Sequence, residues 1–316
     1  MSSLEEQTGV TKVPKYIDGL SFNDAGQLAI VASNLTGRCW NGLLAVFNDA
    51  KFAPNIPHVD YASQNEAGCT DIEWIDEKRI IISTDAGTIE VWQLEDAPIL
   101  SNEILLSEHN DICSALSISK QSKQVASASW DSSIKLWDLE VDMSIHSVHL
   151  HTDKVLDILW NYATPDVFAS ASEDGTVKLY DNRGTGKPAS LLDYQAITHP
   201  MSLDWVTEEK ICIGYSNGDV SMLDTRNTSQ EISKVKIHKK PIHRILIIED
   251  QHLASVSDDM TVKVHKIANW ENTYYDSRHT DYVRGLTYQK QDRSLWTSAW
   301  DGSVHCHNIK INEKME

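Results

Sequence analysis

The chain has 316 residues, of which 41% are hydrophobic, and it contains no apolar run near the roughly 20 residues that a membrane span requires. With 46 acidic and 28 basic residues its formal net charge is −18, so we expect no direct nucleic-acid binding, because contact with phosphates needs a basic surface. This charge favours basic protein partners. The alternative is that the negative surface only keeps the protein soluble.

The N-terminus and the cysteines indicate the compartment. The first ten residues, MSSLEEQTGV, include two glutamates and no apolar stretch, so we expect no export signal. The five cysteines are far apart and form no CxxC pair: Cys39, Cys69, Cys113, Cys212 and Cys306. This spacing argues against a disulfide framework and a zinc site, and it favours a reducing, intracellular environment.

The sequence repeats a hairpin signal, which is clearest at residues 127–138, SASWDSSIKLWD. Two short segments of alternating residues flank the small polar residues of a tight turn, and a Trp-Asp pair ends the second segment. Seven copies begin their turns at Asn41, Ala86, Asp131, Asp174, Asn217, Asp259 and Asp301. Successive copies are 45, 45, 43, 43, 42 and 42 residues apart, with no helix-forming stretch between them.

A period of 42 to 45 residues with Trp-Asp endings is typical of WD repeats, in which each unit forms one four-stranded blade of a propeller. The sequence therefore predicts an all-β fold, a single seven-bladed WD40 β-propeller at residues 10–311, between a leader at 1–9 and a tail at 312–316. The predicted blades are residues 17–62, 63–105, 106–148, 149–194, 195–235, 236–276 and 277–311.

The seventh repeat lacks an outermost strand. Its third strand is predicted to end near Ile309, and the seven residues that remain are mostly polar. Residues 10–16, which include Val10 and Val13, have no other place in the repeats, and we predict that they supply the missing strand. The ring would then close without an exposed sheet edge.

Histidine, serine and aspartate recur together, which raises the question of a nucleophilic triad. The third repeat offers His109, Ser127 or Ser129, Asp131 and Trp137. Related sets in other repeats are His151 with Asp174, His238 with Asp259, and His279 with Asp301. A set that recurs blade by blade indicates a structural hydrogen-bond network, because buried polar groups must be paired wherever they occur.

His305 and His307 lie two residues apart on one predicted strand, a spacing that would allow metal binding. Position 307 aligns with Trp137, however, and no acidic or thiol ligand cluster accompanies the two histidines. We therefore interpret His307 as a packed substitute for tryptophan, and we predict neither a metal nor another cofactor.

The first repeat is irregular. Asn41 follows Ser33 by eight positions, whereas Asp131 follows Ser127 by four, so the first hairpin carries about four extra residues. Arg38 and Trp40 are predicted near its tip. Tryptophan and arginine are the residues most enriched among interface anchors, which favours a partner-binding site over a solvated loop.

Tryptophan also stands directly before the turn in two other repeats, as Trp130 and Trp300. Turns between second and third strands face one side of a propeller, and the first and seventh blades are neighbours in a closed ring. Trp40 and Trp300 are therefore predicted to form one aromatic patch, which would add Trp300 to the partner-binding residues. The alternative is that each tryptophan only packs on its own neighbouring blade.

Three aspartates are predicted on the same side of the ring, each two residues after a histidine that opens a blade. They are Asp111, Asp153 and Asp281. Because carboxylates beside aromatic rings suit a basic protein surface, we predict that these residues face basic substrates.

Several stretches resemble the WD-repeat subunit of the methylosome: SNLTGRCWNGLLAVF at 33–47, QNEAGCTDIEWIDEKRIIISTDAGTIEVWQLED at 64–96, KPAS at 187–190 and HTDYVRGLTY at 279–288. The resemblance implies a non-catalytic adaptor, the obligate partner of the type II protein arginine methyltransferase that makes symmetric dimethylarginine. Such a subunit docks on the enzyme's N-terminal barrel and helps present Arg-rich substrates such as histone tails and Sm proteins. In that family the arginine and tryptophan of the GRCW hairpin insert into the enzyme, which implies this role for Arg38 and Trp40.

The resemblance also implies a protein of the cytoplasm and nucleus that needs no membrane. Two alternatives stay open. One is a WD-repeat scaffold or ubiquitin-ligase substrate receptor of a different complex, which the identity of a co-purifying partner would reveal. The other is a propeller enzyme, which would need titratable groups that converge at the central channel, and a structure without perturbed pKa values there would exclude it.

Overall fold

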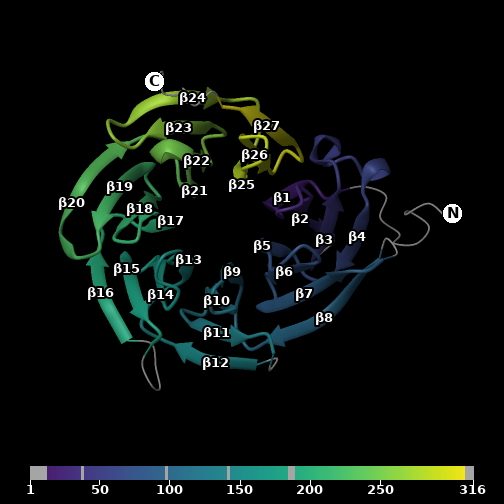
Figure 1. The fold of residues 1–316 in the computed structure, drawn as a ribbon, viewed down its shortest axis with the longest axis horizontal. Coiled ribbons are helices and arrows are strands. Elements are labelled where there is room, and N and C mark those ends of the chain that lie inside the picture. The colour runs from purple at the N-terminus through teal and green to yellow at the C-terminus, as the bar shows by residue number, and fades with distance from the viewer. Residues whose placement is uncertain (1–12, 37–38, 97–98, 141–142, 184–188, 310–316) are drawn as a thin grey trace.

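The computed structural model describes residues 13–36, 39–96, 99–140, 143–183 and 189–309. Seven antiparallel sheets stand around a central channel, and each sheet is one blade of a β-propeller (Figure 1). In this part of the chain the regular elements are strands and three short 3-10 helices. The predicted all-β, seven-bladed fold is thus confirmed. None of the described helices has the length and apolar character of a membrane span.

The strands of each blade follow one another from the channel to the rim of the ring. Blade one contains β1 (Tyr16–Phe22), β2 (Leu28–Thr36), β3 (Cys39–Phe47) and β4 (Tyr61–Asn65). Blade two contains β5 (Cys69–Trp74), β6 (Arg79–Thr84), β7 (Thr88–Leu94) and β8 (Leu100–Ser107). Blade three contains β9 (Cys113–Ser119), β10 (Gln124–Ser129), β11 (Ile134–Asp138) and β12 (Met143–Val148). Blade four contains β13 (Val155–Trp160), β14 (Val167–Ser172), β15 (Thr176–Asp181) and β16 (Ala189–Gln195).

The remaining blades repeat this order. Blade five contains β17 (Pro200–Thr207), β18 (Lys210–Tyr215), β19 (Asp219–Asp224) and β20 (Asn227–Lys236). Blade six contains β21 (Ile242–Ile248), β22 (His252–Ser257), β23 (Val262–Lys266) and β24 (Glu271–Asp276). Blade seven contains β25 (Val283–Gln289), β26 (Ser294–Ala299) and β27 (Val304–Asn308). The 3-10 helices are η1 (Ala50–Phe52) and η2 (Ile56–His58), before β4, and η3 (Glu249–Gln251), before β22.

Burial explains which strands lie inside. The second strands are almost entirely buried, and β14, with the sequence VFASAS, is buried along its whole length. Each is covered on both faces by the neighbouring blades, so its residues are uniformly apolar or small. The outermost strands, such as β24 with ENTYYD, are largely exposed and polar. The core is therefore a series of apolar layers between adjacent blades.

The first hairpin differs from the predicted one. Asn34 pairs with Asn41 and Thr36 with Cys39, so Asn41 lies within β3 and does not begin a turn. The prediction of a turn at Asn41 is wrong because the extra residues continue the antiparallel ladder, which pairs their backbone groups. The connection between the strands comprises residues 37–38, outside the described residues.

Four predicted blade boundaries fall inside outer strands, and those after residues 194 and 235 miss the ends of β16 and β20 by one residue. The boundary after residue 62 lies within β4, because η1 and η2 delay the start of this outer strand. The boundary after residue 105 lies within β8, which continues to Ser107. These differences affect only outer strands and leave the order of the seven blades unchanged.

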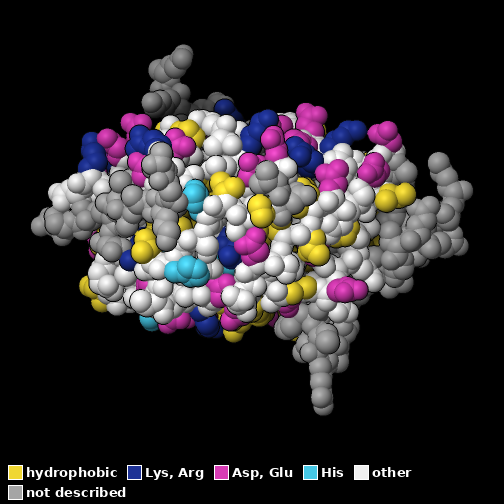
Figure 2. Space-filling model, turned by 90° about the horizontal axis from the view of Figure 1, so that it is seen from below, with side chains coloured by type: hydrophobic (Ala, Val, Ile, Leu, Met, Phe, Trp, Pro, Cys, Tyr) yellow, Lys and Arg dark blue, Asp and Glu magenta, His cyan; other side chains and the backbone are white. Residues whose placement is uncertain are grey.

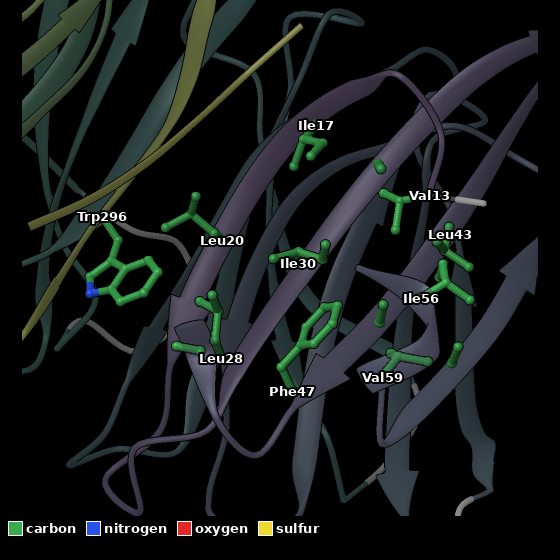
Figure 3. Packing of buried hydrophobic residues seen from close by; sticks show 14 residues of the cluster. Val13, Ile17, Leu20, Leu28, Ile30, Leu43, Phe47, Ile56, Val59 and Trp296 are labelled. Carbon is green, nitrogen blue, oxygen red and sulfur yellow. The ribbon is translucent and has the colours of Figure 1, made fainter. Parts of the chain in front are cut away.

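The contact between the last and first blades closes the ring. Trp296 of β26 belongs to the same buried cluster as Val13, Ile17, Leu20 and Phe47 (Figure 3). Blade seven has three strands among the described residues, and residues 10–12 of the predicted closing strand lie outside them. Residues 13–15 are described but form no strand, so the closing strand stays a prediction.

Candidate functional site

The ring has two faces. The hairpin face carries the turns between the second and third strands of the blades, such as Asp85–Gly87, Trp130–Ser132 and Trp300–Gly302. The reverse face carries the turns between the first and second strands, such as Asn23–Gly26, Ile75–Lys78 and Lys120–Lys123. Because successive strands are antiparallel, these two groups of turns lie at opposite ends of the blades.

The structure brings together the predicted polar set of the third blade. The Nε2 atom of His109 lies 2.7 Å from Ser127 Oγ, and the Trp137 indole donates to the same oxygen at 2.8 Å. The other nitrogen of the His109 imidazole, Nδ1, lies 3.2 Å from Asp131 Oδ2. Ser127 is fully buried, so no substrate reaches its hydroxyl. This geometry suits a structural link between a blade-entry loop and its hairpin.

The same geometry recurs in three further blades. The Nδ1–carboxylate distances are 2.9 Å for His151 and Asp174, 3.0 Å for His238 and Asp259, and 3.5 Å for His279 and Asp301. In each blade the Nε2 atom lies near a buried hydroxyl, at 2.7 Å from Ser170, 2.9 Å from Ser255 and 2.8 Å from Thr297. The recurrence supports a scaffolding role.

Electrostatics keep the His109–Asp131 pair in one protonation state. Although burial opposes ionisation, hydrogen bonds from Ser133 and from the Asn110 backbone hold the pKa of Asp131 at about 2. Burial lowers the pKa of His109 and outweighs the nearby Asp131 charge. At neutral pH the pair is therefore a carboxylate and a neutral imidazole.

His307 is fully engaged in packing. Its Nε2 atom lies 2.7 Å from Thr297 Oγ1, and its Nδ1 atom lies 3.0 Å from the Tyr274 hydroxyl. The interaction with Thr297 repeats that of Trp137 with Ser127, which agrees with the alignment of the two positions. Within the described ranges, no group of three or more His, Cys, Asp or Glu side chains is placed to hold a metal ion.

The predicted anchor at the first hairpin is described only in part. Arg38 lies outside the described residues, and Trp40 is described by its backbone, which pairs with Leu35. The hairpin extends β2 and β3 beyond the point where the other hairpins turn. It therefore projects from the hairpin face.

Trp300 packs on the first blade. Its Nε1 atom donates to Asp18 Oδ1 at 2.7 Å, and its ring meets the Tyr16 ring edge-on at a centroid distance of 5.3 Å. The Arg284 guanidinium lies 4.4 Å from the Trp300 ring centroid. Trp300 thus links blade seven to blade one. Whether it forms a patch with the Trp40 side chain stays a prediction.

Trp130 also meets a neighbouring blade. It is 37% exposed, and Lys154 at the entry of blade four lies 4.1 Å from its ring centroid. Of the aspartates predicted to face substrates, Asp111 and Asp153 are exposed and Asp281 is partly exposed. Each accepts a hydrogen bond from the backbone N–H of the next residue, at 2.8 to 2.9 Å. The three aspartates lie on the hairpin face, as predicted, and their binding of substrates stays a prediction.

Comparison with known proteins agrees with this geometry. The family model for the WD domain, G-beta repeat, matches residues 101–138 and 143–181, which run from β8 to β11 and from β12 to β15. The Methylosome protein WDR77 of Xenopus laevis is 32% identical over 307 residues, which cover 95% of this chain and 91% of that protein. The chain belongs to this family of methylosome WD-repeat proteins.

Other relatives share less with this methylosome WD-repeat propeller. The peroxisomal targeting signal 2 receptor of Schizosaccharomyces pombe is 24% identical over 58% of this chain and 61% of its own length. The E3 ubiquitin-protein ligase COP1 of Arabidopsis thaliana is 24% identical over 48% of this chain and 22% of its own length. These partial likenesses reflect the shared repeat.

The central channel of this methylosome-family propeller contains a set of carboxylates that the sequence analysis missed. Each accepts a hydrogen bond from a backbone N–H of the next blade: Asp71 from Leu116 at 3.1 Å, Glu73 from Ile118 at 3.0 Å, Asp157 from Leu203 at 2.7 Å and Asp204 from Ile247 at 2.5 Å. A carboxylate in the innermost strand thereby ties one blade to the next. The signal in the sequence is an acidic residue within an otherwise apolar strand, as in CTDIEW and VLDILW.

Burial perturbs these channel carboxylates. It raises the pKa of Glu73 to about 8, with a further contribution from the Asp71 charge, and it raises the pKa values of Asp157 and Asp204 to about 7. The Arg244 guanidinium of blade six forms an ion pair with Asp71 of blade two. Perturbed pKa values are therefore present at the channel, so this criterion does not exclude a propeller enzyme. These carboxylates accept hydrogen bonds from the backbone of the next blade, which indicates that they link blades.

Proposed function

We propose that this chain is a non-catalytic adaptor that binds and stabilises a type II protein arginine methyltransferase in a methylosome. The observation that carries the proposal is the full-length likeness to a methylosome protein. The extended β2–β3 hairpin supports it, because the extra residues include an arginine and a tryptophan. The adaptor would also recruit basic substrates, including histone tails and Sm proteins, in the cytoplasm and nucleus.

The hairpin supplies a physical basis for partner binding. A paired ladder that continues past the blade to Thr36 and Cys39 restricts the backbone of these strand residues, so they lose little conformational entropy when a partner binds. Burial of one tryptophan in a partner pocket contributes on the order of 2 kcal/mol or more. The net charge of −18 favours encounter with Arg-rich substrates.

Co-purification tests the proposal. The methyltransferase from the same source is expressed with the full chain, as wild type and as Arg38→Ala/Trp40→Ala. We expect the double variant to lose the enzyme and to retain the circular dichroism spectrum and melting temperature of the wild type. Trp130→Ala, on the hairpin face of blade three, is the matched control and should retain the enzyme.

Two results would overturn this proposal. Unchanged affinity of the double variant would show that the hairpin is not the anchor. Recovery of a ubiquitin ligase or another assembly in place of a methyltransferase would favour the alternative scaffold function. Fluorescence imaging of the tagged chain tests the proposed cytoplasmic and nuclear distribution.

A further inference from the structure

A groove opens between blades five and six, at the reverse face and the adjoining rim of the ring. Its volume is about 320 Å³, at the low end of the roughly 300–1,000 Å³ that is usual for ligand pockets. Its described lining residues include none from the hairpin of blade one and none from the histidine sets. Six of them define what we call the interblade groove: Val206, Lys210, Met222, Ile232, Ile267 and Trp270.

The walls of the interblade groove are mainly apolar. Val206, Met222 and Trp270 pack against the buried cluster between blades five and six and are themselves only partly buried. Ile232, on the outer strand β20, is 47% exposed. On the edge of the ring that Figure 2 shows, hydrophobic side chains are instead scattered among charged and polar ones. An apolar hollow that the fold leaves open indicates a binding site for an apolar group.

Ile232 is apolar although its position in the fold does not require this. It is the unpaired residue of a β-bulge between β19 and β20. Glu103 and Thr273 occupy the same bulge position in blades two and six. A bulge turns a side chain away from the direction that the regular ladder would give it. Here it adds an exposed isoleucine to the wall of the groove.

Lys210 supplies the only charge among the described residues that line the groove. The carboxylates closest to it in the fold already have a partner, because Arg226 contacts Asp224 at 2.7 Å and Glu209 at 2.6 Å. Asp224 pairs with Lys210 in the β18–β19 ladder, yet its side chain bonds to Arg226. The Lys210 ammonium is therefore available to a carboxylate that a ligand supplies.

The outer strand β20 favours a polypeptide as this ligand. It ends the sheet order of blade five, so no described strand pairs with its outer edge. An extended segment can follow such an edge with its backbone and place one side chain in a neighbouring pocket. A lipid or another small apolar acid cannot use the backbone groups of this edge in the same way.

We propose that the interblade groove binds an extended segment of a partner protein in which a large apolar residue stands next to an acidic one. The apolar side chain enters between Ile232 and Trp270, and the carboxylate pairs with the Lys210 ammonium. An Arg-rich segment would place like charge against Lys210, so this partner differs from the basic substrates of the proposed function.

Peptide binding to the full chain tests the interblade groove. The probe is a fluorescent decapeptide of glycine and serine that contains one phenylalanine followed by one glutamate, and anisotropy measures its binding. We expect saturable binding by the wild type and no measurable binding of a probe with serine in place of the phenylalanine. No saturable binding by the wild type would overturn the proposal.

Ile232→Glu tests the apolar wall. Because Glu103 occupies the same bulge position in blade two, this variant should keep the melting temperature of the wild type. We expect its affinity for the probe to fall about tenfold or more, since a charge replaces the apolar contact. Ile197→Glu makes the same substitution at a 92% exposed residue outside the groove and should retain affinity within about twofold. Equal losses in both variants would overturn the proposal in favour of diffuse charge repulsion.

Lys210→Gln tests the ion pair through a double-mutant cycle. In a second probe glutamine replaces the glutamate. We expect Lys210→Gln to weaken the glutamate probe about fivefold and the glutamine probe less than about twofold. Lys239→Gln, which removes an exposed cation of the hairpin face, should change neither. Equal losses for the two probes would refute the pairing with Lys210.

Two other occupants would be revealed by the same approach. A dimer in analytical ultracentrifugation that Ile232→Glu abolishes would assign the groove to a second copy of the chain. Probe binding that occurs only after Ile311→Ser/Met315→Ser would assign it to the C-terminal residues of the chain itself. Either result would overturn the choice of a partner segment.

Enzyme binding separates this proposal from the proposed function. Ile232→Glu should still co-purify with the methyltransferase, because the proposed anchor belongs to blade one. If the wild type binds the probe but no methyltransferase, the groove assignment stands and the adaptor function fails. The opposite result would refute the groove assignment alone.

Discussion

Arg244 of β21 and Asp71 of β5 form an ion pair through Nη2 and Oδ1, although their blades are not neighbours in the ring. Asp71 uses its other carboxylate oxygen to accept from the Leu116 backbone N–H of blade three. One carboxylate thus connects blades two, three and six. The guanidinium also lowers the pKa of Asp157, against the larger effect of burial.

Removal of this guanidinium should destabilise the ring. In Arg244→Met the channel carboxylates lose their counter-charge, and we expect the free energy of unfolding to fall by about 2 kcal/mol. This is below the cost for a fully buried pair, because the Arg244 side chain is 35% exposed. Urea denaturation measures the change. Arg183→Met, which removes an exposed partner of Asp181, should alter stability by less than about 0.5 kcal/mol. An equally stable Arg244→Met variant would contradict the proposed role of the pair.

Glu73 should make stability depend on pH above neutrality. Its pKa is about 8 in the folded chain, against about 4.3 in an unfolded one. Between these values the folded state retains a proton that the unfolded chain has released, so this contribution to stability is lost as the pH rises through about 8. Asp157 and Asp204 act in the same direction.

Denaturation midpoints between about pH 7.5 and 9, above the pKa of an unfolded histidine, measure this effect. We expect stability to decline with pH in the wild type, and Glu73→Gln to be more stable by about 1 kcal/mol at the upper end of the range. Histidines whose folded pKa is lowered, such as His279 with about 4, and unfolded histidines with a pKa of about 6.5 are both largely neutral in this window. A flat profile in the wild type would be inconsistent with this assignment.

Ser127 should be essential to the third blade. Its hydroxyl oxygen serves both His109 and Trp137, so Ser127→Ala leaves two buried ring nitrogens without this partner. We expect a loss of about 2–3 kcal/mol, measured by thermal and urea unfolding. Ser107→Ala on the outer strand β8, where the residue is exposed, provides the comparison and should change little. Similar stability in the two variants would argue against a structural role of the set.

Trp300 and Trp130 should differ although both stand directly before a turn. Trp300→Phe removes the donor to Asp18, a carboxyl whose pKa burial raises to about 6 and this hydrogen bond lowers. We expect the variant to lose about 1–2 kcal/mol at pH 7, because the ionised Asp18 is left without the indole N–H. Trp130→Phe removes no such hydrogen bond, and Trp130 is 37% exposed, so this variant should leave stability unchanged. Thermal unfolding of both variants distinguishes the two positions.

Recurrence made the blades and the histidine sets predictable. His109 and Asp131 are 22 residues apart, and the same separation recurs within a residue or two in the other sets, so their contact follows from the repeat. The insertion before Asn41 was detectable as extra length, but its position depended on strand register, which tertiary pairing decides.

The channel carboxylates could not be predicted in the same way. Asp71 and Asp157 occupy one position of the innermost strand, paired with Ser83 and Ala171, while Glu73 and Asp204 occupy another. Their partners are backbone groups of the next blade, which leave no mark in the sequence. The pairing of Arg244 with Asp71 depends on the width of the closed ring, which no single repeat contains.

The cluster that joins Trp296 to the first blade has a consequence for synthesis on the ribosome. Phe22, whose ring meets the Trp296 ring at 5.7 Å, is made early, and its partner emerges only with the last repeat. Until then the apolar side of blade one that faces blade seven is uncovered, because β26, which carries Trp296, belongs to the last blade along the chain. The nascent chain therefore exposes a hydrophobic surface during most of its translation. We expect chaperones to bind it most strongly just before the last blade emerges from the ribosome.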